Sequence, residues 1–134
     1  MVSLTNANTP HSIAQNITYH ASIGKGITQR ILTQLSVSPI SEVWRKDALS
    51  SCDHLEVQLH ELVRFDALYS QYMHNTPPWE KLLRNLEELI PALRAVVQLA
   101  KTKNTVLSLA EKVRLNFSQL HQLAQGSLGY QKAA

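Results

Sequence analysis

Three side chains that can bind a metal ion are spaced along one predicted helix. Asp53, Glu56 and His60 stand at positions i, i+3 and i+7, which places them on one helical face. Metal sites inside helical bundles need matching ligands, such as Glu-x-x-His, on a second helix, and the sequence has no such spacing. We therefore predict no metal site, and we interpret the three residues as a solvated strip beside an apolar seam.

Cys52 is the only cysteine, and together with six histidines it supplies the residue types of nucleophilic catalysis. It falls between Ala48 and Leu55 on an apolar seam, where a small buried thiol packs without reacting. A lone cysteine forms no internal disulfide, which is typical of a reducing compartment. Residues 24–26, Gly-Lys-Gly, follow no predicted strand, unlike a phosphate-binding loop. The sequence therefore predicts no enzymatic activity and no cofactor.

The composition is typical of one helical domain. The chain has 134 residues, of which 44% are hydrophobic and 6% aromatic, with four glycines and five prolines. That apolar content is enough for a packed core, while the few turn residues argue against a many-stranded sheet. We predict a flexible leader at residues 1–11 and a single domain at residues 12–134. The net charge of +3 does not by itself indicate a nucleic acid or an anionic membrane as partner.

Segments for export or membrane insertion are not evident. The N-terminal residues lack the basic start and apolar run of a signal peptide. The most apolar stretch, residues 89–100, contains Arg94 and is shorter than the ~20 residues that cross a bilayer. We expect a cytoplasmic protein without a membrane partner.

Apolar spacing predicts a first helix near the N-terminus. Apolar residues recur in four-residue steps from Ile13 to Leu35, so this helix is expected to start from a cap near Ser12. Gly24 and Gly26 leave open either a break or a locally soft helix, because a glycine costs about 1 kcal/mol in a helix interior.

A second, longer helix is expected to start at Ser38 and Pro39 and to end before the next two prolines. Steps of four and three residues form an apolar seam along it, made of Ala48, Cys52, Leu55, Leu59, Leu62, Asp66, Tyr69 and Met73. A charge in such a seam is costly if it is buried alone. We therefore expect Asp66 to pair with an arginine of a neighbouring helix.

The C-terminal half predicts two more amphipathic helices. The third is expected to begin near Thr76, and the fourth to extend from a cap at Asn104 or Thr105 to Gly126. Because no glycine or proline separates them, one continuous helix over residues 79–125 is an open alternative. We predict an all-α fold, an antiparallel helical bundle of three long amphipathic helices plus an N-terminal helix.

Charge is distributed unevenly along the chain. Residues 39–75 carry three bases and six acids, whereas residues 102–134 carry four bases and one acid. We therefore expect the second helix to pair electrostatically with the last one.

Residues 31–46, ILTQLSVSPISEVWRK, resemble a helix-turn-helix, in which two helices and a turn meet the major groove of DNA. The segment departs from that pattern at Ser36, where the turn usually has glycine, and at Glu42, where a buried aliphatic residue is usual. The resemblance implies a DNA-binding regulator, which we keep as the alternative function.

Residues 104–130 resemble the C-terminal region of FlgN-type flagellar export chaperones, with spacing that differs by one residue. The residues that carry the likeness are Asn104, Asn116, Phe117, Leu120, Leu123, Leu128, Gly129 and Tyr130. The resemblance implies a small helical protein whose C-terminal segment engages secretion clients or the export machinery.

These patterns favour a non-enzymatic protein–protein interaction module, an adaptor or a small secretion-chaperone-like protein. Apolar residues outside the single seams predict a homodimer. We place the partner surface on residues 105–125, where apolar anchors alternate with cations that steer an acidic client. The residues concerned are Leu109, Lys112, Arg114, Phe117 and Leu120. The open alternative is that they complete the intramolecular core.

Overall fold

The computed structural model describes the backbone of residues 9–74 and 76–133, and the side chains of these residues as far as Ser127. Four helices make up this part of the chain: α2 (Pro10–Val37), α3 (Glu42–Met73), α4 (Glu80–Leu99) and α5 (Lys103–Ala133). No strand occurs among the described residues.

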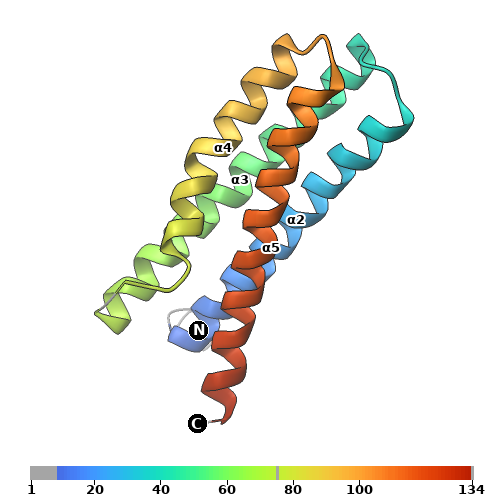
Figure 1. The fold of residues 1–134 in the computed structure, drawn as a ribbon. Helices are drawn as coiled ribbons and strands as arrows, with labels where there is room; N and C mark the ends of the chain where they lie inside the picture. Colours follow the sequence, from blue (N-terminus) through green and yellow to red (C-terminus); the bar gives the residue numbers. More distant parts are fainter. Residues whose placement is uncertain (1–8, 75, 134) are drawn as a thin grey trace, which may run out of the picture.

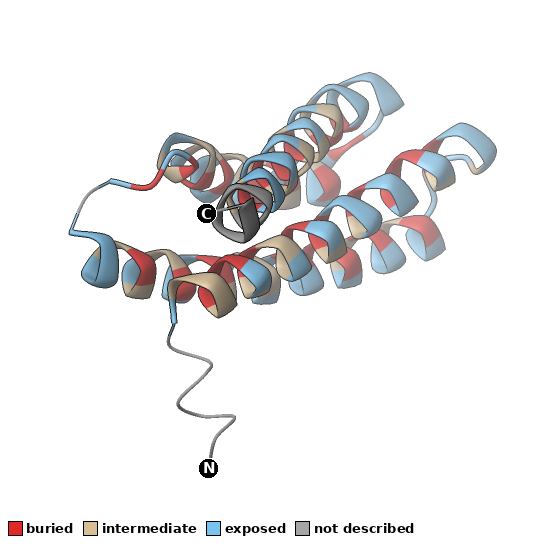
Figure 2. Cartoon of the chain, turned by 90° about the horizontal axis from the view of Figure 1, so that it is seen from below, coloured by how far each residue is buried: buried red, intermediate tan, exposed pale blue. Residues whose placement is uncertain are grey.

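The four helices form a closed ring around one core. Both α2 and α4 pack against α3 and α5, so α3 and α5 occupy opposite corners. The connections are short, and neighbouring helices run antiparallel (Figure 1). Figure 2 shows the buried residues along the sides of the helices that face one another. The predicted all-α antiparallel bundle is confirmed, with the N-terminal helix as a full member of the ring.

The corner positions change the expected charge pairing. The acidic α3 was predicted to pair with the basic α5, but its packing neighbours are α2 and α4. That prediction is wrong, because the order of the helices around the ring separates the two. Residues 10 and 11, which were predicted to belong to the leader, are instead the first two residues of α2, and residues 1–8 lie outside the described residues.

Two helix starts differ from the predicted caps. Thr9 rather than Ser12 caps α2, because Thr9 Oγ1 accepts a hydrogen bond of 3.1 Å from the Ser12 amide. Ser41 rather than Ser38 caps α3, and its Oγ accepts from the amide of Trp44 at 3.2 Å. The Ser38 amide still donates to Gln34 O at 2.9 Å, so Ser38 closes the last turn of α2.

The ends of α4 and α5 also differ from the expectation. The helix α4 begins at Glu80 rather than near Thr76, since the two prolines belong to the preceding connection. The continuous helix over residues 79–125 is wrong, because the chain reverses between Leu99 and Lys103. The helix α5 begins before the predicted caps and continues through Gly126 to Ala133.

Gly24 marks a close approach between α2 and α5. The helix α2 passes through Gly24 and Gly26 without a break. A Cβ atom at Gly24 would lie 2.6 Å from Cδ1 and Cζ of Phe117, whose ring is fully buried. The missing side chain therefore leaves the space that the ring occupies. At Gly26 an added Cβ would meet nothing within 4 Å.

Gly24→Ala is expected to lower the free energy of unfolding by ~1–3 kcal/mol, because the new methyl group overlaps a ring in a packed core. Gly26→Ala is the matched control and is expected to raise stability by up to ~1 kcal/mol, since alanine is the better helix former. Urea denaturation followed by circular dichroism measures both. Equal effects of the two substitutions would contradict the close approach.

Trp79 anchors the start of α4 against α3. Its side chain is fully buried, and its Nε1 donates a hydrogen bond of 3.0 Å to Asp66 Oδ1. The Trp79 ring meets Tyr69 edge-on, with 4.8 Å between the ring centroids. The partner of Asp66 is thus an indole N–H, and the predicted arginine partner is wrong. Burial raises the pKa of Asp66, and the hydrogen bond from Trp79 opposes this shift.

Asp66→Asn is expected to stabilise the protein at pH 7 and to have less effect near pH 4. A raised pKa in the folded state means that the stability contributed by protonated Asp66 is present at low pH and is lost as pH rises through that pKa. Asparagine stays neutral, and its Oδ1 can still accept from Trp79. Urea titrations between pH 4 and pH 7 measure the difference, with the exposed Asp47→Asn as control. A variant that is less stable than the native protein at pH 7 would contradict this account.

Candidate protein-binding surface

Two of the five predicted partner-binding residues are core residues. Phe117 and Leu120 are fully buried, which is the alternative that the sequence left open. Both lie in the helix that α2 covers when the ring closes, so on the folded bundle they offer no surface to a partner.

The other three predicted residues remain at or near the surface. Leu109 is half-buried against the core, and Lys112 is exposed. The Nη2 atom of Arg114 bonds Glu111 Oε2 on the same helix at 2.9 Å. A partner contact requires a side chain that is at least partly exposed and is not already held in an ion pair. Among the five predicted residues, Leu109 and Lys112 meet both conditions within the described part of the chain.

The helix α4 keeps one row of apolar side chains at its edge. Leu82, Leu89 and Val96 recur every seven residues and are only partly buried. The neighbouring row, which includes Leu83 and Ile90, is buried in the core. Residues at heptad spacing lie on one stripe of a helix, so the partly buried row forms a continuous apolar line.

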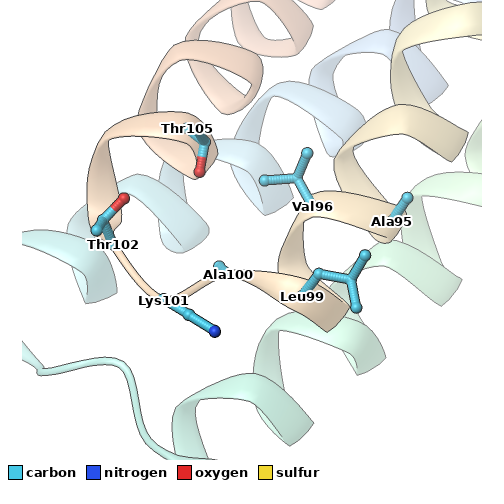
Figure 3. A pocket seen from close by; sticks show the side chains of 7 residues that line it. All are labelled: Ala95, Val96, Leu99, Ala100, Lys101, Thr102 and Thr105. Atoms are coloured by element: carbon cyan, nitrogen blue, oxygen red, sulfur yellow. The ribbon is translucent and has the colours of Figure 1, made fainter.

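Two hollows lie at the ends of this row, between α4 and α5. The first, about 390 Å³, adjoins the α4–α5 connection and is lined by Ala95, Val96, Leu99, Ala100, Lys101, Thr102 and Thr105 (Figure 3). The second, about 430 Å³, is lined by Pro78, Lys81, Leu82, Gln119, Gln122 and Leu123. Leu99 is 80% exposed and Leu123 is 41% exposed. Both hollows therefore have an exposed leucine at their rim.

A polar contact joins the two helices between the hollows. Asn85 Nδ2 on α4 donates to Asn116 Oδ1 on α5 at 3.1 Å, and Asn116 Nδ2 donates to Lys112 O at 2.8 Å. Leu109 is seven residues before Asn116, which places it on the same side of α5. We define the α4–α5 face as the row of Leu82, Leu89 and Val96, the two hollows, and the exposed residues that border them.

Few charges border the α4–α5 face. Lys81 and Lys101 line the hollows, and Lys112 is exposed one helical turn from Asn116. Glu88 is exposed and lies seven residues from both Lys81 and Ala95, which line the two hollows. The three residues therefore lie on one stripe of α4. The face is therefore apolar along its length with a small excess of positive charge.

The candidate metal ligands are engaged in an ion pair. Arg94 on α4 donates from Nε to Glu56 Oε1 at 2.7 Å and from Nη2 to Asp53 Oδ1. These two carboxylates raise the pKa of Arg94 above its ordinary value. His60 is exposed, and the described residues contain no group of three or more His, Cys, Asp and Glu placed to hold a metal ion. The acidic strip thus ties α3 to α4.

The segment that resembles a helix-turn-helix has a different geometry here. The helices of that motif cross at ~90–120°, whereas α2 and α3 run antiparallel. His20 and Gln58 are joined across the two helices by a hydrogen bond of 2.6 Å between Nδ1 and Oε1. Trp44 is buried. The resemblance is therefore confined to the sequence pattern.

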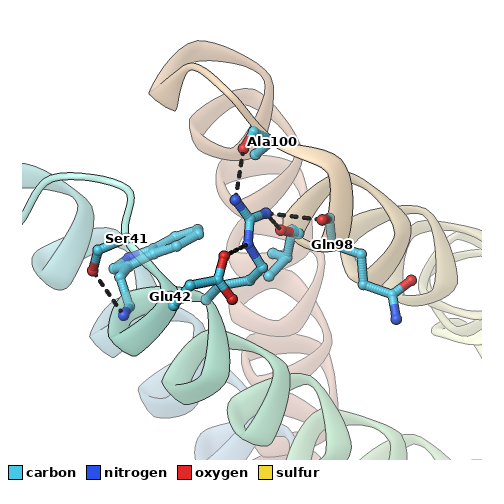
Figure 4. A network of polar contacts seen from close by, with 7 residues as sticks. Ser41, Glu42, Gln98 and Ala100 are labelled. Carbon is cyan, nitrogen blue, oxygen red and sulfur yellow. Dashed lines mark hydrogen bonds and ion pairs between the residues drawn. The ribbon is translucent and has the colours of Figure 1, made fainter.

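Arg45, in the same segment, binds the end of α4. Its Nη1 donates to Val97 O at 2.5 Å and to Gln98 O at 2.9 Å, and its Nη2 donates to Ala100 O at 3.1 Å (Figure 4). A cation at these carbonyls satisfies acceptors that the helix end leaves free. The local pattern around Arg45 did not indicate this role, because the partners are more than 50 residues away in the sequence.

Cys52 lies in the core as predicted. Its side chain is fully buried, and burial raises the pKa of the thiol to about 11. The thiolate is the reactive form, so both burial and protonation oppose reaction with thiol reagents.

Cys52 is expected to react slowly with N-ethylmaleimide at pH 8 in the native state and stoichiometrically after unfolding in urea. The reagent reaches the thiol only when the core opens, and at pH 8 the thiol is protonated. The double variant Cys52→Ala, Ser50→Cys is the control, since residue 50 is exposed and its thiol should react at once. Mass spectrometry counts the adducts. Fast labelling of the native chain would show that the core around Cys52 is open.

No helix within residues 9–74 and 76–133 is both long enough and apolar enough to span a bilayer. The chain has no significant match among protein-family models, curated proteins or solved structures. The resemblances to export chaperones and to helix-turn-helix proteins therefore have no supporting family match, and function has to be argued from the α4–α5 face.

Proposed function

We propose that the protein is a non-enzymatic helical adaptor that binds another polypeptide across the α4–α5 face. The observation that carries this proposal is the partly buried apolar row on α4 with a hollow at each end. The row extends over about 21 Å from Leu82 to Val96 at the rise of an α-helix. An amphipathic helix of four turns placed along two bundle helices would cover it.

The charges around the face support an acidic partner. Among the side chains that the structure describes, Lys81, Lys101 and Lys112 border the face, together with one acid, Glu88. An acidic flank on the partner helix would be attracted to these lysines, which favours association and fixes orientation. An acidic client is also what the sequence predicts, and Lys112 is one of the contact residues that it proposes.

The alternative, a DNA-binding regulator, makes a separate prediction. Binding to duplex DNA through phosphate contacts falls steeply with salt concentration. The antiparallel course of α2 and α3 and the engagement of Arg45 give this alternative no geometric support. Fluorescence anisotropy with labelled duplex DNA at low and high salt tests it directly.

Leu99→Glu and Leu123→Glu are expected to weaken partner capture by about tenfold each, because a charge replaces an apolar contact at a hollow. Both leucines are exposed, so circular dichroism should show an unchanged fold. Val57→Glu is the matched control, since Val57 is 57% exposed on α3, away from the face. Affinity capture from lysate compares the three variants with the native chain. A captured protein that is lost equally with all three, or with none, would contradict a site on the α4–α5 face.

A further inference from the structure

We propose that the α4–α5 face binds a second copy of this chain, in a dimer whose twofold axis runs parallel to the helices. In that arrangement α4 of each copy lies against α5 of the other. The inference rests on the proposed function, because it names the occupant of the same face.

Opposite charges lie at one level on the two helices. Asn85 on α4 and Asn116 on α5 are hydrogen-bonded, which sets the relative height of the helices. Glu88 follows Asn85 by about one turn, and Lys112 precedes Asn116 by about one turn. Because the helices are antiparallel, both steps lead toward the α4–α5 connection. Glu88 and Lys112 therefore stand at the same height on neighbouring helices of one face.

A dimer with its twofold axis parallel to the helices would form the contact between Glu88 and Lys112 twice. Such an axis exchanges α4 and α5 across the interface and preserves height along the helices. Glu88 of each copy then faces the partner's Lys112, which gives two reciprocal ion pairs. An axis across the helices at the middle of the apolar row, near Leu89, would instead place α4 against α4 and bring the two copies of Glu88 close together. The pairing of Glu88 with Lys112 thus favours the parallel axis.

The hollows fit the same arrangement. Leu99 is 80% exposed at the end of α4, at the height where Thr102 of the α4–α5 connection and Thr105 of α5 line the first hollow. In the dimer each Leu99 lies opposite the partner's hollow. Leu123, at the other end of α5, lies opposite the partner's second hollow beside Leu82. Each copy therefore supplies an apolar side chain for both hollows of the other.

Small side chains and helix direction permit close contact. Ala92 and Ala95 separate Glu88 from Leu99 along the exposed stripe of α4, so a helix can approach the backbone there. The partner's α5 runs antiparallel to α4, as the two helices do within one copy, so their dipoles oppose each other. Neither Glu88 nor Lys112 forms an ion pair within the described part of the chain, so both are available.

Charge-reversal substitutions at Glu88 and Lys112 test the dimer. Sedimentation equilibrium at tens of micromolar in low salt should give the mass of a dimer for the native chain. Glu88→Lys and Lys112→Glu should each weaken dimerisation by about tenfold, because each substitution creates two like-charge contacts. The double variant Glu88→Lys, Lys112→Glu restores opposite charges and should recover the native affinity. Lys46→Glu, on the exposed side of α3, is the control and should leave the mass unchanged.

The outcomes separate this inference from the proposed function. A monomeric native chain would overturn the dimer, and so would a dimer that neither single exchange weakens or that the double exchange does not recover. If the chain is monomeric while Leu99→Glu still weakens capture of an acidic protein, the proposed function stands and the occupant is a different polypeptide. If the dimer responds as expected but nothing else is captured, self-association is the function of the face.

Discussion

Contact between the first and last helices closes the ring, and the rest of the structure depends on it. Phe117 of α5 lies against the backbone of α2 at Gly24, a position where any larger residue would overlap the ring. Burial of one such aromatic side chain contributes roughly 1.5–3 kcal/mol, and Leu120, about one turn further along α5, is also fully buried. Without α2 in this place, α5 would expose part of its apolar face, which supplies six of the 27 buried hydrophobic residues of the described chain.

Polar contacts then set the heights of the helices relative to one another. Arg94 ties α4 to α3 through two carboxylates, Arg45 ties the start of α3 to the end of α4, and Asn85 ties α4 to α5. Partly exposed ion pairs contribute little stability each. Their effect is on register, because every one of them joins residues from different helices.

The same register determines which surface is left for other molecules. The charges between α3 and α4 are paired across the helices, whereas on the α4–α5 face Glu88 and Lys112 are exposed at equal height. This face also carries the partly buried row of α4 and the two hollows. An apolar row, two hollows and exposed charges are therefore combined on this one face of the bundle.

Spacing of apolar residues was enough to predict the helices and most of the core. Cys52, Leu55 and Leu62 on α3 are buried as their seam predicted, since periodicity within one helix depends only on that helix. The partner surface was only partly predictable. An apolar residue on one helix can be either a surface anchor for a partner or a core residue, and the sequence of α5 does not distinguish the two. Phe117 and Leu120 are core residues because α5 packs against α2.

The tertiary structure alone decided the partners of Asp66 and Arg45 and the order of the helices around the ring. Asp66 accepts from Trp79, and Arg45 binds carbonyls at the end of α4, although neither pairing has a local sequence signal. Periodicity shows which side of a helix is apolar, but a bundle has several ways to place such sides against each other. The choice among them depends on contacts between residues far apart in the chain, such as Gly24 with Phe117.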